Sequence, residues 1–113
     1  MMPLINLRTN ISSIQDADQL LKGLSVALAS ATGKPEAYVM TLLETGIPMT
    51  FAGSDEACAY LEIKSIGSLK PPAMSAQFCE LINSSLGIPR DRIYISFHDV
   101  SASDWGWDGR TFG

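Results

Sequence analysis

The sequence predicts an α+β fold in which two β-α-β pseudo-repeats form a four-stranded mixed sheet with two helices on one face. Two observations lead to this prediction. In each half of the chain, β-rich runs flank a stretch with helical hydrophobic spacing. The halves also share letters, since residues 33–39 (GKPEAYV) and 87–95 (GIPRDRIYI) each lead from a glycine-x-proline group into a strand with a tyrosine. Right-handed crossovers then place both helices on the same side of the sheet.

The first repeat begins with residues 4–9 (LINLRT), which are typical of a strand. Residues 12–33 then switch to a helical period, and four small or apolar side chains share one face: Leu20, Leu24, Leu28 and Ala31. Residues 38–43 (YVMTLL) are a second β-rich run. Strand, helix and strand in this order make one β-α-β unit.

The second repeat follows the same plan. Residues 57–66 (ACAYLEIKSI) predict a strand, residues 71–87 a helix and residues 92–97 (RIYISF) a final strand. The inward face of this helix is expected to hold Met74, Phe78, Leu81 and Ile82.

Local signals predict where the helices begin and end. Ser13 followed by Asp16 resembles a capping box at the start of the first helix. Gly33 supplies a C-terminal stop for that helix. Gly87 and Pro89 do the same for the second helix.

The face of the sheet opposite the helices needs a cover. Residues 38–43 are apolar on both faces, which is the pattern of a strand buried on both sides, so a partner subunit is the economical explanation. The tail at 104–113 (DWGWDGRTFG) is too short for a core of its own. It either adds a strand across a subunit boundary or uses Trp105 and Trp107 to cap its own sheet.

Composition limits the class of protein. With 46% hydrophobic and 18% charged residues, residues 1–113 read as one compact domain, and the positive mean hydropathy favours oligomerisation. A net charge of −4 without a basic stripe argues against nucleic acid and anionic membranes as partners. No signal peptide pattern or 18-residue apolar span is present, so we expect a cytosolic protein whose release would not use a signal peptide.

The cysteines and the histidine suggest no cofactor chemistry. Cys58 and Cys79 have no partner at metal-ligand spacing, so we expect buried thiols, without a disulfide, a metal or another cofactor. His98 has no serine or cysteine nucleophile spaced to recruit it, and we interpret it as structural or solvated.

Five pieces of sequence, in order along the whole chain, carry a resemblance to a known family. They are a near-terminal proline entering a strand, ATGKP after the first helix, SIG after the third strand, DRIYISFHD in the last main strand, and a GW…TF ending. Together they resemble the macrophage migration inhibitory factor family of the tautomerase superfamily. The resemblance implies a homotrimer of β-α-β-β-α-β subunits whose sheets enclose a central channel.

The resemblance implies that Pro3, as an amino-terminal proline, is the general base of keto-enol tautomerisation. An α-amino group has a pKa of about 8, and a catalytic base works best near the operating pH. An apolar pocket and a neighbouring positive charge would both lower that pKa. Lys34 matches the family's pocket lysine and would also pair with a substrate oxygen. Without the resemblance, Lys34 reads as a solvated lysine at a helix C-terminus.

The remaining site residues are carried over in the same way. The backbone N–H of Ile66 would hold a substrate carboxylate, and four aromatic residues would line an apolar pocket between subunits: Tyr38, Tyr94, Trp105 and Phe112. An arylpyruvate-like 2-keto acid fits such a pocket, although each ring could also be plain core packing. Ser96 stands where relatives place an asparagine, which bears on substrate preference.

Two departures from the family pattern narrow the function. The second cysteine of the family's Cys-x-x-Cys pair is replaced, because Leu61 follows Cys58 at that spacing, so thiol-oxidoreductase activity is not expected. Charged positions used for receptor recognition are replaced by Ser13 and Gly46, which argues against a cytokine role.

The start of the chain decides whether Pro3 can act as a base. After Met1 and Met2, the nitrogen of Pro3 is a tertiary amide, which is not basic. Three explanations are open: translation begins at Met2, the extra Met is not native, or this member has no catalytic role. The retained Lys34 and the 65–67 turn favour the first two. The function is therefore either a phenylpyruvate tautomerase-like isomerase or a non-catalytic trimeric module that binds a protein partner.

Overall fold

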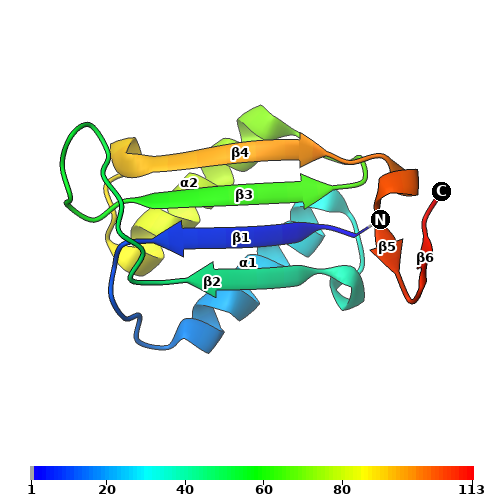
Figure 1. Cartoon of the computed structure of the whole chain (residues 1–113), viewed down its shortest axis with the longest axis horizontal. Helices are drawn as coiled ribbons and strands as arrows, with labels where there is room; N and C mark the ends of the chain where they lie inside the picture. Colours follow the sequence, from blue (N-terminus) through cyan, green and yellow to red (C-terminus); the bar gives the residue numbers. More distant parts are fainter. Residues whose placement is uncertain (1) are drawn as a thin grey trace.

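A computed structural model describes residues 2–113 and contains the predicted four-stranded sheet and two helices (Figure 1). The main elements are β1 (Leu4–Thr9), α1 (Ala17–Thr32), β2 (Met40–Glu44), β3 (Ala59–Ser65), α2 (Pro71–Leu86) and β4 (Ile93–Asp99). The strand order is β2-β1-β3-β4. The β1/β2 and β3/β4 pairs are parallel, whereas β1 and β3 are antiparallel, so the mixed sheet of two β-α-β units is confirmed.

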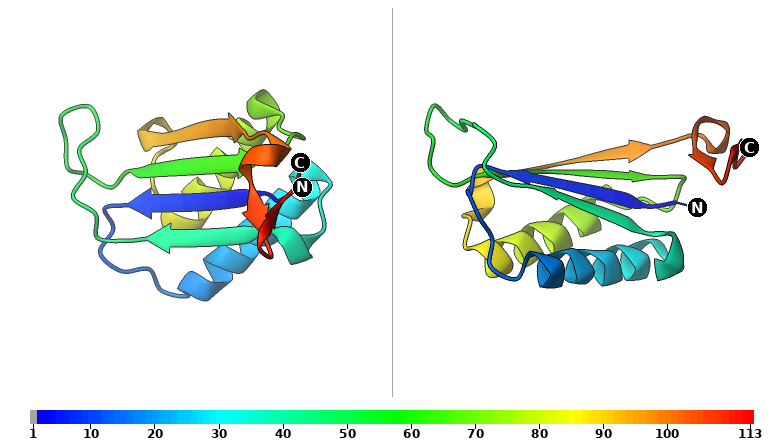
Figure 2. Two further views of the ribbon diagram at one scale, coloured as in Figure 1. Left: turned by 45° about the vertical axis from the view of Figure 1, so that its right-hand side comes forward. Right: turned by 60° about the horizontal axis from the view of Figure 1, so that its bottom comes forward.

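Both helices lie against the same face of the sheet, as predicted, and the core fills the space between them (Figure 2). The sheet contributes alternate residues of its two central strands: Ile5, Leu7, Leu61 and Ile63. The helices contribute one residue per turn: Leu20, Leu24, Leu28, Met74, Phe78 and Ile82. Ala31 and Leu81 pack only at the margin of this core.

The start of α1 differs from the prediction. The helix begins at Ala17, and its N-cap residue Asp16 has a left-handed backbone (φ 58°) with no side-chain capping hydrogen bond. A capping side chain needs an extended backbone to reach the first helical amides. Here the backbone carbonyl of Asp16 accepts from Gln19 and Leu20 instead, so the capping box at Ser13 and Asp16 was a wrong prediction. Gly33 does end the helix with a positive φ of 70°, as expected.

The repeated glycine-x-proline group marks a repeated structure. Pro35 and Pro89 both have extended backbones and both precede a three-residue 3₁₀ helix, η1 (Glu36–Tyr38) and η2 (Arg90–Arg92). A parallel strand follows each of them. Tyr38 therefore lies in η1 and not in the strand, because β2 begins two residues later than predicted.

The tail forms a small unit of its own. After η3 (Ala102–Asp104), strands β5 (Gly106–Trp107) and β6 (Arg110–Thr111) pair as an antiparallel hairpin. Figures 1 and 2 show this hairpin beyond the end of the main sheet, next to the N-terminus. Within residues 2–113 it pairs with no strand of the main sheet.

The face opposite the helices is open in the single chain. Its edge strands expose large side chains, with Met40, Leu42 and Tyr94 at 56%, 42% and 66% of their full accessibility. On the same face, the two central strands β1 and β3 carry mostly polar side chains: Asn6, Arg8, Tyr60, Glu62 and Lys64. The open face is thus apolar at its edges and polar along its middle.

Cys58 is buried, as expected from the sequence, whereas Cys79 is only half-buried, and both thiols are free. Residues 2–113 contain no group of three or more histidine, cysteine or acidic side chains able to hold a metal ion. No helix in the described part of the chain is long and apolar enough to span a membrane.

Candidate functional site

Pro3 is buried at the N-terminal end of β1. Its carbonyl oxygen accepts a hydrogen bond from the backbone of Met40 at 3.1 Å, which ties it to β2. On the other side, Leu4 pairs with Lys64, so Pro3 lies beside the end of β3. Pro3 therefore lies between β2 and the end of β3, at the end of the sheet where β1 begins.

Lys34 reaches this same end of the sheet. It follows Gly33, the C-cap of α1, and its Nζ donates to the backbone carbonyl of Ile66 at 3.5 Å. Ile66 is the first residue after β3. The half-buried lysine is thus held next to the strand end that flanks Pro3, and it is not a free lysine at a helix terminus.

An aromatic cluster extends from this region into the tail. The rings of Tyr38 and Trp107 meet edge to face at a centroid distance of 6.2 Å, and Trp107 stacks on Phe112 at 6.1 Å. The guanidinium of Arg110 lies 5.9 Å from the Trp107 ring centre. The predicted residues Tyr38 and Phe112 are therefore joined by a tryptophan that the sequence analysis did not select.

Trp105, which the resemblance predicted as a pocket residue, lies outside this aromatic cluster. Within residues 2–113 its ring makes none of these aromatic contacts, and its backbone carbonyl accepts from Phe112 at 3.2 Å. It lines a shallow groove of about 360 Å³ with Leu4 and Lys64. The GW…TF ending already contained Trp107, so the signal for the aromatic cluster was present in the sequence.

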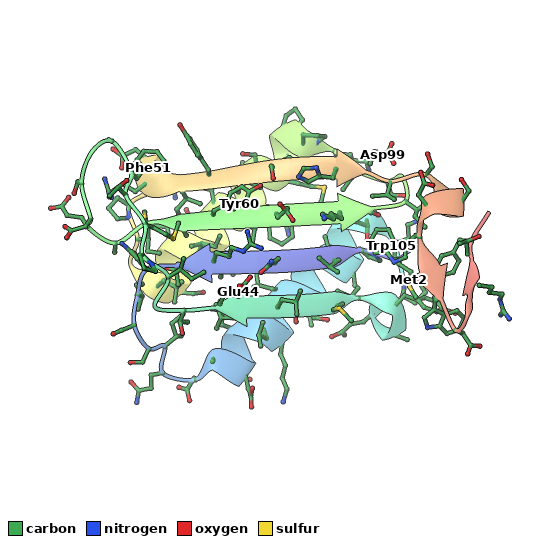
Figure 3. All side chains as sticks on the ribbon, viewed as in Figure 1. Met2, Glu44, Phe51, Tyr60, Asp99 and Trp105 are labelled. Carbon is green, nitrogen blue, oxygen red and sulfur yellow. The ribbon has the colours of Figure 1, made fainter. Side chains whose placement is uncertain are left out.

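Tyr94 and Ser96 do not approach Pro3 within one chain. Tyr94 pairs with Tyr60, which pairs with Arg8, five residues further along β1 than Pro3. In Figure 3, Met2 and Trp105 lie at one end of the sheet, and Phe51, whose ring contacts Tyr94, lies beyond the other end. Only a neighbouring subunit could bring these two residues to the site at Pro3.

Ser96 belongs instead to a chain of hydrogen bonds on the open face. Its hydroxyl lies 2.6 Å from the Tyr60 hydroxyl and 2.9 Å from Nε2 of His98. The sequence analysis found no serine spaced to reach His98, but Ser96 does reach it, since residues two apart on a strand share a face. The exposed, hydrogen-bonded His98 agrees with its interpretation as structural or solvated. The Tyr60 hydroxyl also donates to Glu62 at 3.1 Å, and Lys64 forms an ion pair with Glu62 at 3.5 Å.

This chain is similar to known proteins over almost its whole length. The family described as macrophage migration inhibitory factor (MIF) matches residues 2–113. The chain belongs to this family. It is 35% identical over 114 residues to macrophage migration inhibitory factor of Xenopus laevis, covering 98% of this chain and 99% of the relative.

Solved structures of MIF proteins share the whole fold. A MIF homologue from Prochlorococcus marinus has a TM-score of 0.94 and 50% identity, over 97% of this chain and 99% of that one. The MIF of Trichinella spiralis has a TM-score of 0.91 and 32% identity, over 96% and 99%. The two helices, the four-stranded mixed sheet and the tail are therefore the fold of the MIF family, which is part of the tautomerase superfamily.

In this MIF-family protein, the contacts among the polar side chains of the open face shift the pKa of Glu62. Burial favours the neutral carboxyl, but the hydrogen bond from Tyr60 and the charge of Lys64 outweigh it and hold the pKa below its ordinary value of 4.5. A lowered pKa means that ionised Glu62 stabilises the fold above about pH 4.5, and that this contribution is lost as the pH falls through the folded-state pKa.

Replacing Tyr60 by phenylalanine is expected to raise the pKa of Glu62, because it removes the hydrogen bond that favours the carboxylate. NMR titration of the Glu62 carboxyl carbon measures the change. Tyr94→Phe is the matched control, since Tyr94 lies opposite Tyr60 in the sheet and makes no hydrogen bond to Glu62 within residues 2–113. An unchanged titration in Tyr60→Phe would contradict the assignment.

Proposed function

We propose that this protein is a keto-enol tautomerase of the phenylpyruvate tautomerase type, with the amine of an N-terminal Pro3 as general base. The observation that supports it best is the convergence of Pro3, Lys34 and Ile66 at one end of the sheet. The proposal is tested by the rate at which the C3 protons of phenylpyruvate exchange with deuterium, compared with the uncatalysed rate.

The chemistry needs a base and a place for negative charge. A neutral Pro3 amine would remove a proton from C3 of a 2-keto acid, and the electrons would move to the carbonyl oxygen as the enolate forms. The positive charge of Lys34 at the same end of the sheet disfavours a protonated amine, so it acts in the direction that makes a base at neutral pH.

Lys34 and the backbone of Ile66 are the groups proposed to bind the substrate. Both lie at the strand end beside Pro3. An ammonium that already approaches a backbone carbonyl at 3.5 Å can turn to a substrate carboxylate or enolate oxygen, which is the stronger acceptor.

The mechanism requires a chain that begins at Pro3. In a chain with Met2 attached, the nitrogen of Pro3 is a tertiary amide without a basic lone pair. Whether the native protein carries Met1 is a separate point, and Met1 lies outside the described part of the chain. Pro3 is already buried in its strand-end position with Met2 present, so removal of the residues before it need not create the site.

We propose a homotrimer as the active assembly. Tyr94 and Ser96 lie far from Pro3 in one chain, so they can belong to the pocket only when a neighbouring subunit supplies them. Met40, Leu42 and Tyr94 are exposed on the open face of the single chain, and a neighbouring subunit would bury them.

We also propose a cytosolic location, because the free Cys58 and Cys79 suit a reducing compartment.

The aromatic cluster gives the first prediction for this function. Trp107→Ala is expected to lower kcat/KM for phenylpyruvate by about tenfold, because the rings of Tyr38 and Phe112 lose the partner between them. Thr111→Ala, on the same hairpin, is the matched control, with an expected change below about threefold. Steady-state C3 exchange measures both, and a larger loss in the Thr111 variant would contradict this arrangement.

A second candidate function is a non-catalytic trimer that binds a protein partner. It would apply if a residue stayed attached to Pro3, because the nitrogen of Pro3 is then a tertiary amide and no base. Such a module would tolerate replacement of Pro3, whereas a tautomerase would not.

A further inference from the structure

The loop at residues 45–58, between β2 and β3, extends beyond the end of the sheet (Figures 1 and 2). Near its tip, Phe51 and Ser54 exchange two backbone hydrogen bonds of 2.9 and 3.0 Å. Between them, Ala52 and Gly53 both have positive φ angles, of 53° and 74°. Alanine rarely adopts this backbone, so contacts from elsewhere must hold the turn.

Arg92 supplies these contacts from η2. Its guanidinium donates to four backbone carbonyls of the loop, those of Phe51, Ser54, Glu56 and Ala57, at 2.9 to 3.2 Å. The same guanidinium lies 5.4 Å from the centre of the Phe51 ring. One side chain therefore fixes both the backbone of the turn and the ring at its base.

The contacts use the shape of arginine and not only its charge. Within residues 2–113, no carboxylate forms an ion pair with Arg92. Four of its five N–H groups are directed at carbonyl oxygens by the planar fork of the guanidinium. A lysine has a single nitrogen and could reach only part of this set.

Phe51 connects the loop to Tyr94. The two rings meet at a centroid distance of 4.7 Å and an angle of 64°. Tyr94 is 66% exposed, and in the described chain Phe51 is the one aromatic ring against it. The direction of the exposed tyrosine therefore depends on Phe51, and the position of Phe51 depends on Arg92.

We infer that Arg92 is a positioning residue for substrate specificity: through Phe51 it orients Tyr94 toward the aromatic group of a substrate bound at a neighbouring subunit's Pro3. This inference rests on the proposed function. It assigns Arg92 no contact with the substrate and no part in proton transfer.

The test compares Arg92→Lys with Arg90→Lys, in protein that begins at Pro3. Arg90 lies in the same 3₁₀ helix, is 64% exposed and pairs with Glu80, so its replacement is a matched control. Arg92→Lys is expected to raise KM for phenylpyruvate about three- to tenfold with kcat unchanged, the size of one aromatic contact. C3 exchange of 2-ketobutyrate, which has no ring, should change less than about twofold. Equal losses for both substrates would overturn the inference.

A second readout does not depend on activity. With 3-fluorotyrosine in place of the three tyrosines, Arg92→Lys should shift the ¹⁹F signal of Tyr94 and leave that of Tyr38 unchanged. Phe51→Leu should produce a similar shift, and the double variant should add little to it. An unmoved Tyr94 signal in Arg92→Lys overturns the inference, whereas a moved signal in a protein without C3 exchange contradicts only the proposed function.

Discussion

Retention of Met2 on Pro3 is expected to lower catalysed C3 exchange of phenylpyruvate by about 10²- to 10⁴-fold, the usual contribution of a general base. The physical reason is that acylation removes the basic lone pair from the proline nitrogen. Pro3→Gly, in a chain that begins at residue 3, is expected to lose activity as well. It keeps an amine, but it loses the ring that fixes the position of the nitrogen.

The oligomeric state must be measured beside the rate, because the proposed pocket includes residues of a neighbouring subunit. Sedimentation of the same samples shows whether the assembly is intact. Inactivity of the intact assembly with and without Met2 would favour the protein-binding module. Equal activity with and without Met2 would mean that a residue other than Pro3 moves the proton.

Phe78→Ala is expected to destabilise the fold by about 3–5 kcal/mol, the largest stability effect that we predict. Phe78 lies on the inner face of α2, is fully buried and is among the largest side chains of the core. Its loss would leave a cavity between α2 and the sheet that neighbouring side chains could fill only in part. Urea unfolding at a fixed protein concentration measures the change, since assembly contributes to apparent stability.

Val26→Ala is the matched control for this experiment. Val26 is also a helical apolar residue, but it lies on the outer side of α1 and is 57% exposed. Its replacement should change the free energy of unfolding by no more than about 0.5 kcal/mol. A cost for Phe78→Ala as small as that of Val26→Ala would mean that α2 is not held to the sheet through this side chain.

The elements could be predicted because their signals are local. Periodicity predicted the core faces of both helices, and residues 4–9 matched β1 without error, since strand and helix periods are properties of short windows. The shared glycine-x-proline groups correctly indicated two repeats. The capping box failed because Ser13 and Asp16 fit a spacing rule, whereas the backbone of Asp16 adopts a left-handed conformation.

Parts of the candidate site could also be predicted, because the resemblance matched residues one by one along the chain. Pro3, Lys34 and Ile66 do lie at one end of the sheet. The choice between Trp105 and Trp107 could not be made in this way. On a regular strand, two tryptophans on either side of a glycine would share a face, but Trp105 is the C-cap of η3 and only Trp107 lies in β5, so only the structure shows which ring meets Tyr38.

By itself, the sequence determined the family, the order of the elements and the faces that form the core, because each depends on the chain's own pattern. Only the tertiary structure decided which distant residues meet. It joined Ser96 to His98 and Tyr60, placed Tyr94 at the far end of the sheet from Pro3, and held the loop at 51–57 on Arg92. Such contacts follow from strand register and loop path, which bring together residues that no local pattern relates.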